Sequence, residues 1–408
     1  MATIAVIATL DTKGPEAAYL KECIEGMNHH ALLLDTGMLF EPGAVPDITR
    51  TEILAAGGVH DKDAVSSGGK QLLVKAMTAG LVKVLGELCD SGKIQGVLSI
   101  GGAQGTAMST AAMRELPIGF PKVMISTIAC GSAKFGDYVG NRDITMIPSL
   151  CDVCGINAVT GPIFKSGCGA VIGMIEIAEK QKNLPSGKPV VALTMAGVTT
   201  KSVMRVKELL EDEGYETIVC HCNGVGAIII DELAKQNKLA AVLDITRHDV
   251  GGYLFDGLMK CEPNRFENVY KSGIPVIDFP GAMDFVLVGP PPITREDLKG
   301  QPFMIHTSFH THVRAGYDKM YTCGEHDARE LKSCKGRCAI MIPLRGYSQQ
   351  NEEGKPLYDE QANRGYVDGV KENLGGAVEY IERDMHINDP RFADEIVKEL
   401  NKLMEGRR

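Results

Sequence analysis

The sequence has no apolar run long enough to cross a membrane, and its N-terminus has no basic leader segment. It also has no excess of positive charge, because 43 Lys and Arg residues stand against 52 Asp and Glu residues, for a net charge of −9. Proteins that bind nucleic acid or anionic membranes generally present a cationic face. We therefore expect a cytoplasmic protein with neither nucleic acid nor membrane as a partner. This charge still leaves room for a local cationic pocket.

Several catalytic and metal-binding motifs are also missing. The motif Gly-x-Ser-x-Gly does not occur, and no Ser-His-Asp triad can be assembled from the spacing of the residues. The twelve cysteines contain no repeated Cys-x-x-Cys of zinc-ribbon spacing. We therefore expect reduced, mainly buried thiols rather than disulfides or a structural zinc site. The loose pairs are Cys151 with Cys154, Cys220 with Cys222, and Cys334 with Cys338.

The first residues alternate between strand-like and helix-like patterns. Thr3 to Ala8 is an apolar β-type run, and residues 9–14 read as a turn. Pro15 to Met27 has helical character with Pro in its first turn, and Ala31 to Leu34 is a second strand. A strand, a helix and a strand in this order predict a parallel sheet with a right-handed crossover. Residues 43–67 lack a clean period and predict a long connection.

The same pattern begins again in the second half of the chain. Val190 to Leu193 and Glu216 to Cys220 have strand character, and Lys201 to Glu213 between them has helical character. We interpret this as a weak internal duplication, which predicts an α/β protein built from two Rossmann-like subdomains.

The boundary between the two halves is predicted at Leu184 to Pro189, where Pro, Ser and Gly cluster. The two subdomains would then comprise residues 1–185 and 186–408, each with a mainly parallel sheet, and a cleft would lie between them. Apolar positions at helical spacing from Pro390 to Met404 predict a closing C-terminal helix.

A glycine-rich loop, Gly101 to Thr106, follows the apolar run Gly96 to Ile100 and precedes helix-like residues from Ala107 to Leu116. This order predicts a buried strand, a tight turn and a helix start. The first N–H groups of a helix lack intrahelical partners, and glycine lets an anion approach them closely. The loop matches neither the dinucleotide fingerprint nor the Walker pattern. Two interpretations stay open: a phosphate site, in which Thr106 caps the helix or reaches a metal-bound phosphate oxygen, or a turn whose glycines serve packing only.

Asp11, Thr12 and Lys13 follow the first predicted strand, at the same edge of the sheet as the glycine loop. The Lys13 ammonium is a point charge suited to phosphate, and Asp11 could hold Mg²⁺ directly or through water. In the alternative interpretation, Asp11 and Thr12 cap the following helix and Lys13 is solvated.

The second half carries a comparable set of polar residues after its predicted strands. His221 or His306 could act as a general acid or base, because imidazole titrates near neutrality. His306, His310 and His312 lie within seven residues, which could suit a transition metal if the backbone folds around it. They could equally be structural histidines on one strand face. The other polar residues at this edge include Asn223, Asp244, Thr246, Arg247, His248, Asp284 and Arg314.

These blocks resemble the tobamovirus-resistance-protein-like ATP-binding domain family. The resemblance rests on Thr9 to Gly14, Gly101 to Thr106, Ser126-Thr127 with Gly131, and Pro280 to Asp284, and it extends over nearly the whole chain. It implies a two-subdomain α/β protein, a homodimer, that binds ATP with Mg²⁺ in its N-terminal subdomain. The plant member binds viral replication proteins, so the family includes an interaction role. Carried over to this sequence, the phosphate contacts would be Asp11, Thr12, Lys13, Gly101, Gly102, Gln104, Gly105 and Thr106, with Ser126 and Thr127 nearby.

The sequence departs from the family pattern in its second half. His306 is followed by Thr and Ser instead of Asn and Pro, and His310 and His312 replace apolar positions. Leu357 to Glu360 stands where Phe-x-Asp-Pro is expected. A shared second-half substrate therefore does not follow from the resemblance.

Three functions are compatible with these features. The leading hypothesis is an enzyme that binds ATP in its first half and acts on a small acidic or hydroxylated substrate in the cleft. Acid–base and carboxylate-binding roles would then fall to His221, His306, Asp284 and Arg314. The second hypothesis is a nucleotide-gated binding or regulatory protein without chemistry. The third is a hydrolase or lyase with a metal at His306, His310 and His312.

Overall fold

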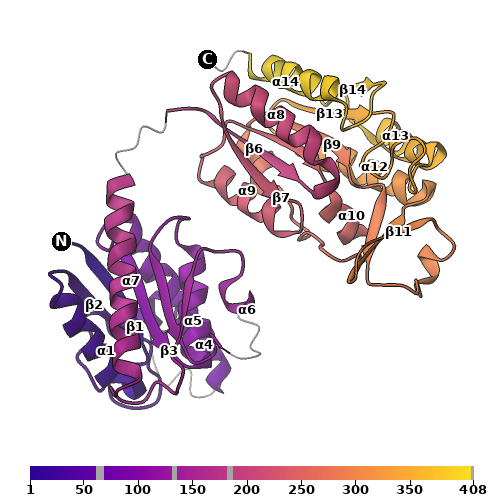
Figure 1. Cartoon of the computed structure of the whole chain (residues 1–408). Coiled ribbons are helices and arrows are strands. Elements are labelled where there is room, and N and C mark those ends of the chain that lie inside the picture. The colour runs from indigo at the N-terminus through magenta and orange to yellow at the C-terminus, as the bar shows by residue number, and fades with distance from the viewer. Residues whose placement is uncertain (61–68, 131–135, 182–186, 406–408) are drawn as a thin grey trace. The chain divides into compact units, whose positions relative to one another are not determined.

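The computed structural model describes residues 1–60, 69–130, 136–181 and 187–405. The chain divides into two compact units, Met1–Pro185 (unit 1) and Ser186–Arg408 (unit 2) (Figure 1). Each unit has its own parallel sheet and its own hydrophobic core. The predicted α/β class with mainly parallel sheets is therefore confirmed. Gly131, which belongs to one of the family-like blocks, lies outside the described residues.

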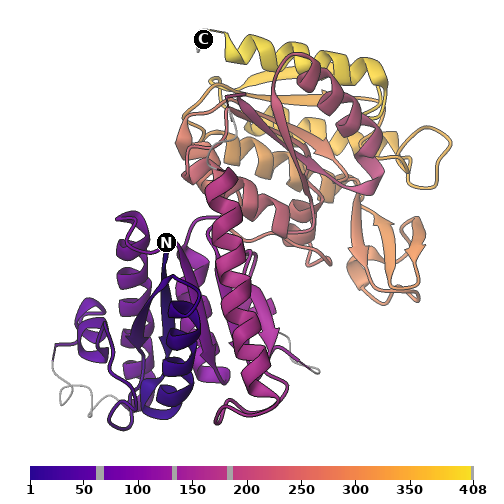
Figure 2. The same ribbon diagram turned by 60° about the vertical axis from the view of Figure 1, so that its left-hand side comes forward.

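Unit 1 contains a parallel sheet with the strand order β2-β1-β3-β4-β5. Alternate residues of β1 serve two cores, because Ile4 and Val6 face the helices α1 and α7, whereas Ala5 and Ile7 face α2, α4 and α5. Figure 2 shows the long helix α7, in magenta, alongside this sheet. The strands are β1 (Thr3–Ala8), β2 (His30–Asp35), β3 (Gly96–Gly101), β4 (Lys122–Ser126) and β5 (Thr145–Pro148), and the helices are α1 (Leu10–Glu25), α2 (Arg50–Ala56), α4 (Gly69–Asp90), α5 (Ala103–Glu115), α6 (Gly136–Val139) and α7 (Thr160–Gln181).

Unit 2 contains a second parallel sheet with the order β14-β13-β9-β8-β6-β7. Its strands are β6 (Val190–Met195), β7 (Glu216–His221), β8 (Ala241–Thr246), β9 (Val276–Gly281), β13 (Cys338–Pro343) and β14 (Glu379–Arg383). A small antiparallel sheet, β10-β12-β11, is formed by β10 (Phe285–Val288), β11 (Phe303–Thr307) and β12 (His310–Arg314). The predicted strand at Phe303 to His306 thus pairs in a hairpin and not in the main sheet.

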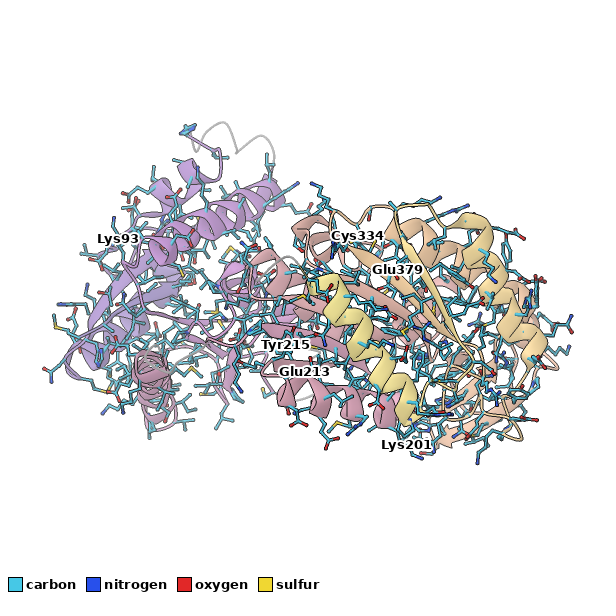
Figure 3. All side chains as sticks on the ribbon, turned by 90° about the horizontal axis from the view of Figure 1, so that it is seen from above. Lys93, Lys201, Glu213, Tyr215, Cys334 and Glu379 are labelled. Atoms are coloured by element: carbon cyan, nitrogen blue, oxygen red, sulfur yellow. The ribbon has the colours of Figure 1, made fainter. Side chains whose placement is uncertain are left out.

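Two helices cover one face of the main sheet of unit 2. The predicted closing helix is confirmed as α14 (Pro390–Met404), which packs with α8 (Thr200–Asp212) on the core formed by residues such as Leu243 and Phe279. In Figure 3 α14 is yellow and lies beside α8, which runs from near Lys201 to near Glu213. The remaining helices are α9 (Val225–Lys235), α10 (His248–Leu254), α11 (Glu267–Ser272), α12 (Tyr317–Leu331) and α13 (Glu360–Asn373), with short 3₁₀ turns η1 (Gly197–Thr199) and η2 (Glu296–Leu298).

Three element boundaries differ from the sequence-based expectation. Helix α1 begins at Leu10, so the predicted turn 9–14 is its first turn, with a break in helical geometry at Lys13. Helix α5 begins at Ala103 because Gly102 takes the extended N-cap conformation. Within the predicted long connection, Thr49 and Glu52 form a capping box that starts α2.

Helix α7 is the one helix in the described part of the chain whose length and composition would also suit a membrane crossing, over Thr160–Lys180. The sequence-based expectation contained no such segment. Phe164, Cys168 and Val171 of α7 are buried in the core of unit 1. This side of α7 packs on the sheet of unit 1, and 39% of the apolar window is buried.

Unit 2 is crossed by a buried network of ion pairs centred on Arg247. Its guanidinium group binds Asp244, Asp278 (2.7 Å) and Asp327 (2.9 Å), all fully buried. A second buried arginine, Arg265, binds Asp244 (2.6 Å) and Asp249 (3.2 Å). Burial raises the pKa of Asp278 well above its usual range, against the opposing effect of Arg247. The network joins β8 and β9 to α10 and α12.

Asp284 and Arg314, two of the predicted second-half site residues, are fully buried. The Arg314 guanidinium donates to the Asp284 carbonyl oxygen (2.6 Å) and to the Asn363 side chain (2.7 Å). The Asp284 carboxylate accepts the Ser348 hydroxyl (2.8 Å). Solvent does not reach either side chain, so in this structure the two residues bind only other parts of unit 2. Their hydrogen bonds join the turn between β9 and β10 to strand β12, to helix α13 and to the segment that precedes α13.

Asp284 predicts a pH dependence of stability. Burial raises its pKa from 3.8 to about 6, so between these values the folded protein binds more protons than the unfolded chain. The free energy of unfolding should therefore fall as the pH rises through this window, by on the order of 3 kcal/mol at about 1.4 kcal/mol per pKa unit. Asp284→Asn should flatten this slope in urea unfolding followed by circular dichroism at pH 4 to about 7. Ser348→Ala, which removes a bond to the ionised form, should extend the window to higher pH; an unchanged slope in Asp284→Asn would contradict the assignment.

The contact between α2 and α4 predicts a second effect on stability. A Cβ atom added at Gly80 would lie 1.8 Å from the Ile53 carbonyl oxygen, whereas one added at Gly86 of the same helix would meet open space. Gly80→Ala should therefore destabilise unit 1 by about 1–3 kcal/mol, as overpacking does. Gly86→Ala should be neutral or stabilising by up to about 1 kcal/mol, through helix propensity alone. Thermal unfolding of both variants checks this, and equal midpoints would show that the helices can separate freely.

Candidate functional site

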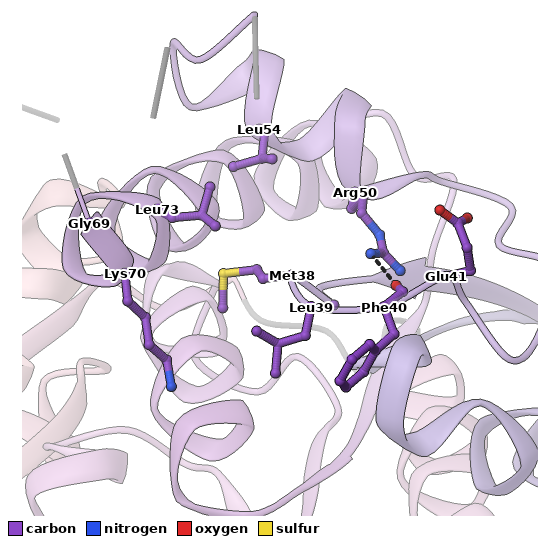
Figure 4. A pocket seen from close by; sticks show the side chains of 10 residues that line it. Met38, Leu39, Phe40, Glu41, Arg50, Leu54, Gly69, Lys70 and Leu73 are labelled. Carbon is purple, nitrogen blue, oxygen red and sulfur yellow. Dashed lines mark hydrogen bonds between the residues drawn. The ribbon is translucent and has the colours of Figure 1, made fainter. Parts of the chain in front are cut away.

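Two cavities adjoin each other at the carboxyl-terminal edge of the sheet in unit 1. The first, of about 430 Å³, is called the glycine-loop cavity here, and the second, of about 400 Å³, the α2–α4 cavity. They share Met38, Leu39, Lys70 and Leu73. The glycine-loop cavity is lined by these four and by Thr9, Asp11, Thr12, Lys13, Gly102, Ala103, Gln104 and Gly105. The α2–α4 cavity is further lined by Gly37, Phe40, Glu41, Arg50, Leu54 and Gly69 (Figure 4).

The glycine-loop cavity lies where the strand order of the sheet reverses. Strand β1 has β2 on one side and β3 on the other, and the cavity is lined by the residues that follow β1 and β3. Open α/β sheets bind ligands at such switch points. The structure therefore brings together the two predicted segments, Asp11 to Lys13 and Gly102 to Gly105.

The start of α5 forms one wall of this cavity. The first intrahelical hydrogen bond runs from the Thr106 N–H to the Gly102 carbonyl oxygen (2.9 Å), so the N–H groups of Ala103, Gln104 and Gly105 precede it. A Cβ atom at Gly102 or Gly105 would have no neighbour closer than 3.8 Å and 4.0 Å, respectively. Packing within the protein does not explain glycine at these two positions, which favours the phosphate interpretation of the loop.

Three of the predicted phosphate contacts turn out to be structural. Thr106 and Ser126 are fully buried, and their hydroxyl groups bind each other (2.6 Å). Gly101 is buried in β3, and a Cβ atom there would lie 3.3 Å from the Gly105 Cα atom. These residues hold the ends of β3 and β4 together and do not line the cavity. Thr127 lies beside the loop, its hydroxyl oxygen 3.8 Å from a Cβ position at Gly102.

Asp11 holds the segment that separates the two cavities. One oxygen of its carboxylate accepts the backbone N–H groups of Met38 (2.9 Å), Leu39 (2.7 Å) and Phe40 (3.4 Å). Its other oxygen lies against Gly37, where a Cβ atom would come within 2.7 Å. Asp11 lines the glycine-loop cavity, and only one of its two carboxylate oxygens takes part in these hydrogen bonds. Asp11 also does not cap α1, since the N-cap residue is Thr9.

Asp35 and Arg50 also hold the segment from Gly37 to Phe40 in place. The Asp35 carboxylate accepts the N–H groups of Leu10 (3.1 Å) and Gly37 (2.8 Å) and pairs with Arg50 (2.7 Å). Arg50 also donates to the Phe40 carbonyl oxygen (2.6 Å), a bond drawn in Figure 4. The sequence analysis did not identify this pair, although Asp35 directly ends a predicted strand.

Two lysines supply positive charge to the glycine-loop cavity. The Lys13 side chain lines the cavity and is not simply solvated, because its ammonium donates to the Val153 carbonyl oxygen. Lys70, at the start of α4, lines both cavities, and in Figure 4 Met38 and Leu39 lie between it and Arg50. Sequence reasoning missed Lys70, since nothing in its neighbourhood distinguishes it from the other lysines of α4.

Unit 2 has its own cavity of about 150 Å³, called the histidine cavity here. It too lies at a strand-order reversal, because β6 is flanked by β7 and β8 and the residues that follow these three strands contribute to the lining. It brings together the predicted His221 and His306, but not Asp284 and Arg314. The full lining is Ala196, Gly197, Val198, His221, Cys222, His248, Met259, Phe285, Leu287, His306, His310 and His312.

The histidines of this cavity stack on one another and do not converge on a metal position. The His306 and His312 rings are 4.7 Å apart and tilted by 22°, and His312 stacks on Phe285 at 4.0 Å. Nitrogen atoms in nearly parallel stacked rings point sideways and do not face a shared ion. In the described ranges no group of three or more His, Cys, Asp or Glu residues could hold a metal ion. The structure thus speaks against the predicted site at His306, His310 and His312.

Solved structures resemble this chain only distantly. UDP-GlcNAc 2-epimerase from Neisseria meningitidis has 13% identity and a TM-score of 0.24, over 68% of this chain and 82% of that protein. The enzyme of the same name from Methanocaldococcus jannaschii has 8% identity and a TM-score of 0.23, over 97% and 92%. Similarity at this level has no bearing on function.

Sequence comparison is far more specific. A UPF0261 protein of Clostridium tetani is 33% identical over 403 residues, which cover 98% of this chain and 99% of that protein. The ToMV resistance protein Tm-1(GCR237) of Solanum lycopersicum is 33% identical over 336 residues, 80% of this chain and 44% of that protein. The N-terminal and C-terminal domains of the uncharacterised protein family UPF0261 match residues 2–180 and 188–404. The chain therefore belongs to the UPF0261 family, with a domain of that family in each unit.

Proposed function

We propose that unit 1 binds a magnesium nucleotide, with ATP as the nucleotide that the family resemblance implies. The observation that carries this proposal is the shared cavity of Asp11 to Lys13 and Gly102 to Gly105 at the switch point of the sheet. The N–H groups at the start of α5 would receive the phosphates, and the helix dipole adds to their attraction. Lys13 and Lys70 would neutralise part of the remaining charge.

The base and ribose would occupy the adjoining α2–α4 cavity. Its apolar lining residues, Met38, Leu39, Phe40, Leu54 and Leu73, offer a surface for the face of a purine, and Glu41, Arg50 and Lys70 add polar groups for the ribose and base edges. The volumes of about 430 and 400 Å³ fall within the range of about 300–1,000 Å³ for ligands of this size.

Magnesium would enter with the phosphates and be bound by their oxygens and by water. Mg²⁺ keeps several waters when it binds together with a nucleotide, so an all-protein ligand set is not required. Asp11 fits a different task, since its carboxylate already accepts three N–H groups of the segment between the cavities. Its substitution would loosen that segment.

The lining of the glycine-loop cavity supports binding more directly than hydrolysis. Asp11 is the one carboxylate among its described lining residues, and one of its oxygens already accepts three backbone N–H groups. A general base must be free to accept a proton from the attacking water. We therefore propose nucleotide binding as the function of unit 1.

The lysine assignment predicts a selective loss of affinity. Lys13→Ala and Lys70→Ala should each weaken MgATP binding about 10- to 100-fold, since a hydrogen bond to a charged group contributes about 1.5–3 kcal/mol. Lys75→Ala is the matched control, because Lys75 is exposed on the same helix as Lys70 and lines neither cavity. Isothermal titration of the full chain measures the three affinities, with thermal unfolding to verify folding. Equal affinities in all variants, or no binding by the unsubstituted protein, would refute the proposal.

The role of Asp11 predicts an effect that does not depend on magnesium. Asp11→Asn replaces a charged acceptor of three N–H groups by a neutral one, which should loosen residues 38–40 and weaken ATP binding severalfold. The same loss is expected with excess Mg²⁺ and with EDTA, because the carboxylate is not a metal ligand. Titrations under both conditions check this. A loss confined to samples with Mg²⁺ would identify Asp11 as a metal ligand after all.

A further inference from the structure

The histidine cavity contains two imidazole groups that are buried and incompletely hydrogen-bonded. His248 and His312 are each 4% exposed, and both line the cavity. Within the described structure, the Nε2 atom of His248 and the Nδ1 atom of His312 are buried without a hydrogen-bond partner. An unpaired buried polar atom costs about 1–3 kcal/mol. Such atoms at a cavity wall point to a ligand that would pair with them.

The tautomer of His248 follows from its one hydrogen bond. Its Nδ1 atom lies 3.4 Å from the carbonyl oxygen of Ala282, which can only accept. The proton of the neutral ring must therefore be on Nδ1, and Nε2 carries a lone pair. Burial lowers the pKa of His248, so the ring stays neutral at pH 7 and the lone pair is available.

The ring of His248 is held in place by stacking as well. It packs on Phe285 at 4.9 Å, and Phe285 in turn stacks on His312 at 4.0 Å. Burial lowers the pKa of His312 to about 3, so this ring is also neutral at pH 7. The cavity therefore presents fixed neutral imidazoles at its buried side, whereas His221 and His306 are exposed.

Other chemistries fit this cavity less well. The Cys222 thiol donates to the buried Asp249 carboxylate (3.0 Å), and burial raises its pKa well above the usual range, so it is not a nucleophile at pH 7. A metal ion is disfavoured by the stacked rings described above. A lone pair on a neutral ring requires a hydrogen-bond donor, and the volume of about 150 Å³ requires a small one.

We propose that the histidine cavity binds a small hydroxylated molecule and that the Nε2 atom of His248 accepts the hydrogen bond of its hydroxyl group. This assigns the contact to His248 and not to the two histidines favoured by the sequence, His221 and His306. The position at the strand-order reversal of the sheet in unit 2 is where an α/β fold of this kind binds its ligand. The cavity lies wholly in unit 2, so the result is independent of nucleotide binding by unit 1.

The test uses the full chain with ¹⁵N-labelled histidine and NMR spectra that report the protonation of both ring nitrogens. The probes are glycolate and glycerol, with acetate as the analogue that lacks a hydroxyl group and Zn²⁺ as the metal probe. We expect His248 to carry its proton on Nδ1 and its Nε2 signal to shift when glycolate or glycerol is added. Acetate should bind at least about tenfold more weakly than glycolate, because it leaves the lone pair unpaired.

Three variants separate the contact from a structural effect. In the unsubstituted protein the probes should also shift the His312 signal, because His312 lines the same cavity. His248→Phe keeps the stacking on Phe285 but removes the acceptor, so this shift of the His312 signal should be lost. His248→Gln supplies an amide oxygen as acceptor and should restore part of the binding. His30→Phe, at an exposed histidine of unit 1, should bind as the unsubstituted protein does.

A proton on Nε2 of His248 in the free protein would overturn the proposal. Equal affinity for glycolate and acetate would overturn it as well. So would spectra in which neither glycolate nor glycerol shifts the Nε2 signal of His248. A shift caused by Zn²⁺ alone would overturn it too and would reassign the cavity to a metal. Unchanged His312 chemical shifts in the ligand-free His248→Gln variant verify that the cavity is intact.

Discussion

The architecture of unit 2 depends on two guanidinium groups that never reach solvent. Arg247 and Arg265 bind four carboxyl groups from β8, β9, α10 and α12, and burial raises the pKa of one of them, Asp278. Loss of one member of such a network costs about 3–5 kcal/mol, since it leaves a buried charge without a partner. Arg247 immediately precedes His248, so the network also holds the backbone at the wall of the histidine cavity that His248 forms. The position of His248 at the cavity wall is thus set by charges that lie outside the cavity.

In unit 1 the segments beside the cavities are held in place by carboxylates that accept backbone N–H groups. Asp35 binds the first N–H of α1 and the N–H of Gly37, and Asp11 binds the three N–H groups that follow Gly37. A connection after a parallel strand would otherwise carry unpaired donors. In both units the residues nearest the cavities are therefore held by acidic side chains from the strand ends. The duplication suggested by the sequence extends to strand order, since β2-β1-β3 and β7-β6-β8 are equivalent arrangements.

Much of this fold could be predicted because apolar periodicity and glycine turns are local signals. They identified the parallel sheets, the closing helix α14 and the convergence of Lys13 with Gln104 at one edge. Local signals do not specify which polar atoms remain free at that edge. Thr106 and Asp11 looked like ligand contacts, but their partners, Ser126 and the N–H groups of residues 38–40, come from distant segments. Lys70 and His248 were inconspicuous for the same reason, because the cavity around Lys70 and the carbonyl of Ala282 beside His248 exist only in the folded chain.

The glycine contact between α2 and α4 has a consequence for the stiffness of unit 1. Cβ atoms at Gly57 or Gly80 would collide with carbonyl oxygens of the opposite helix, so the two backbones touch without side chains between them. Rotamer changes cannot alter the spacing of two backbones in direct contact. The two helices should therefore move as one body, and adaptation at the α2–α4 cavity is left to its side chains, such as Leu54 and Leu73.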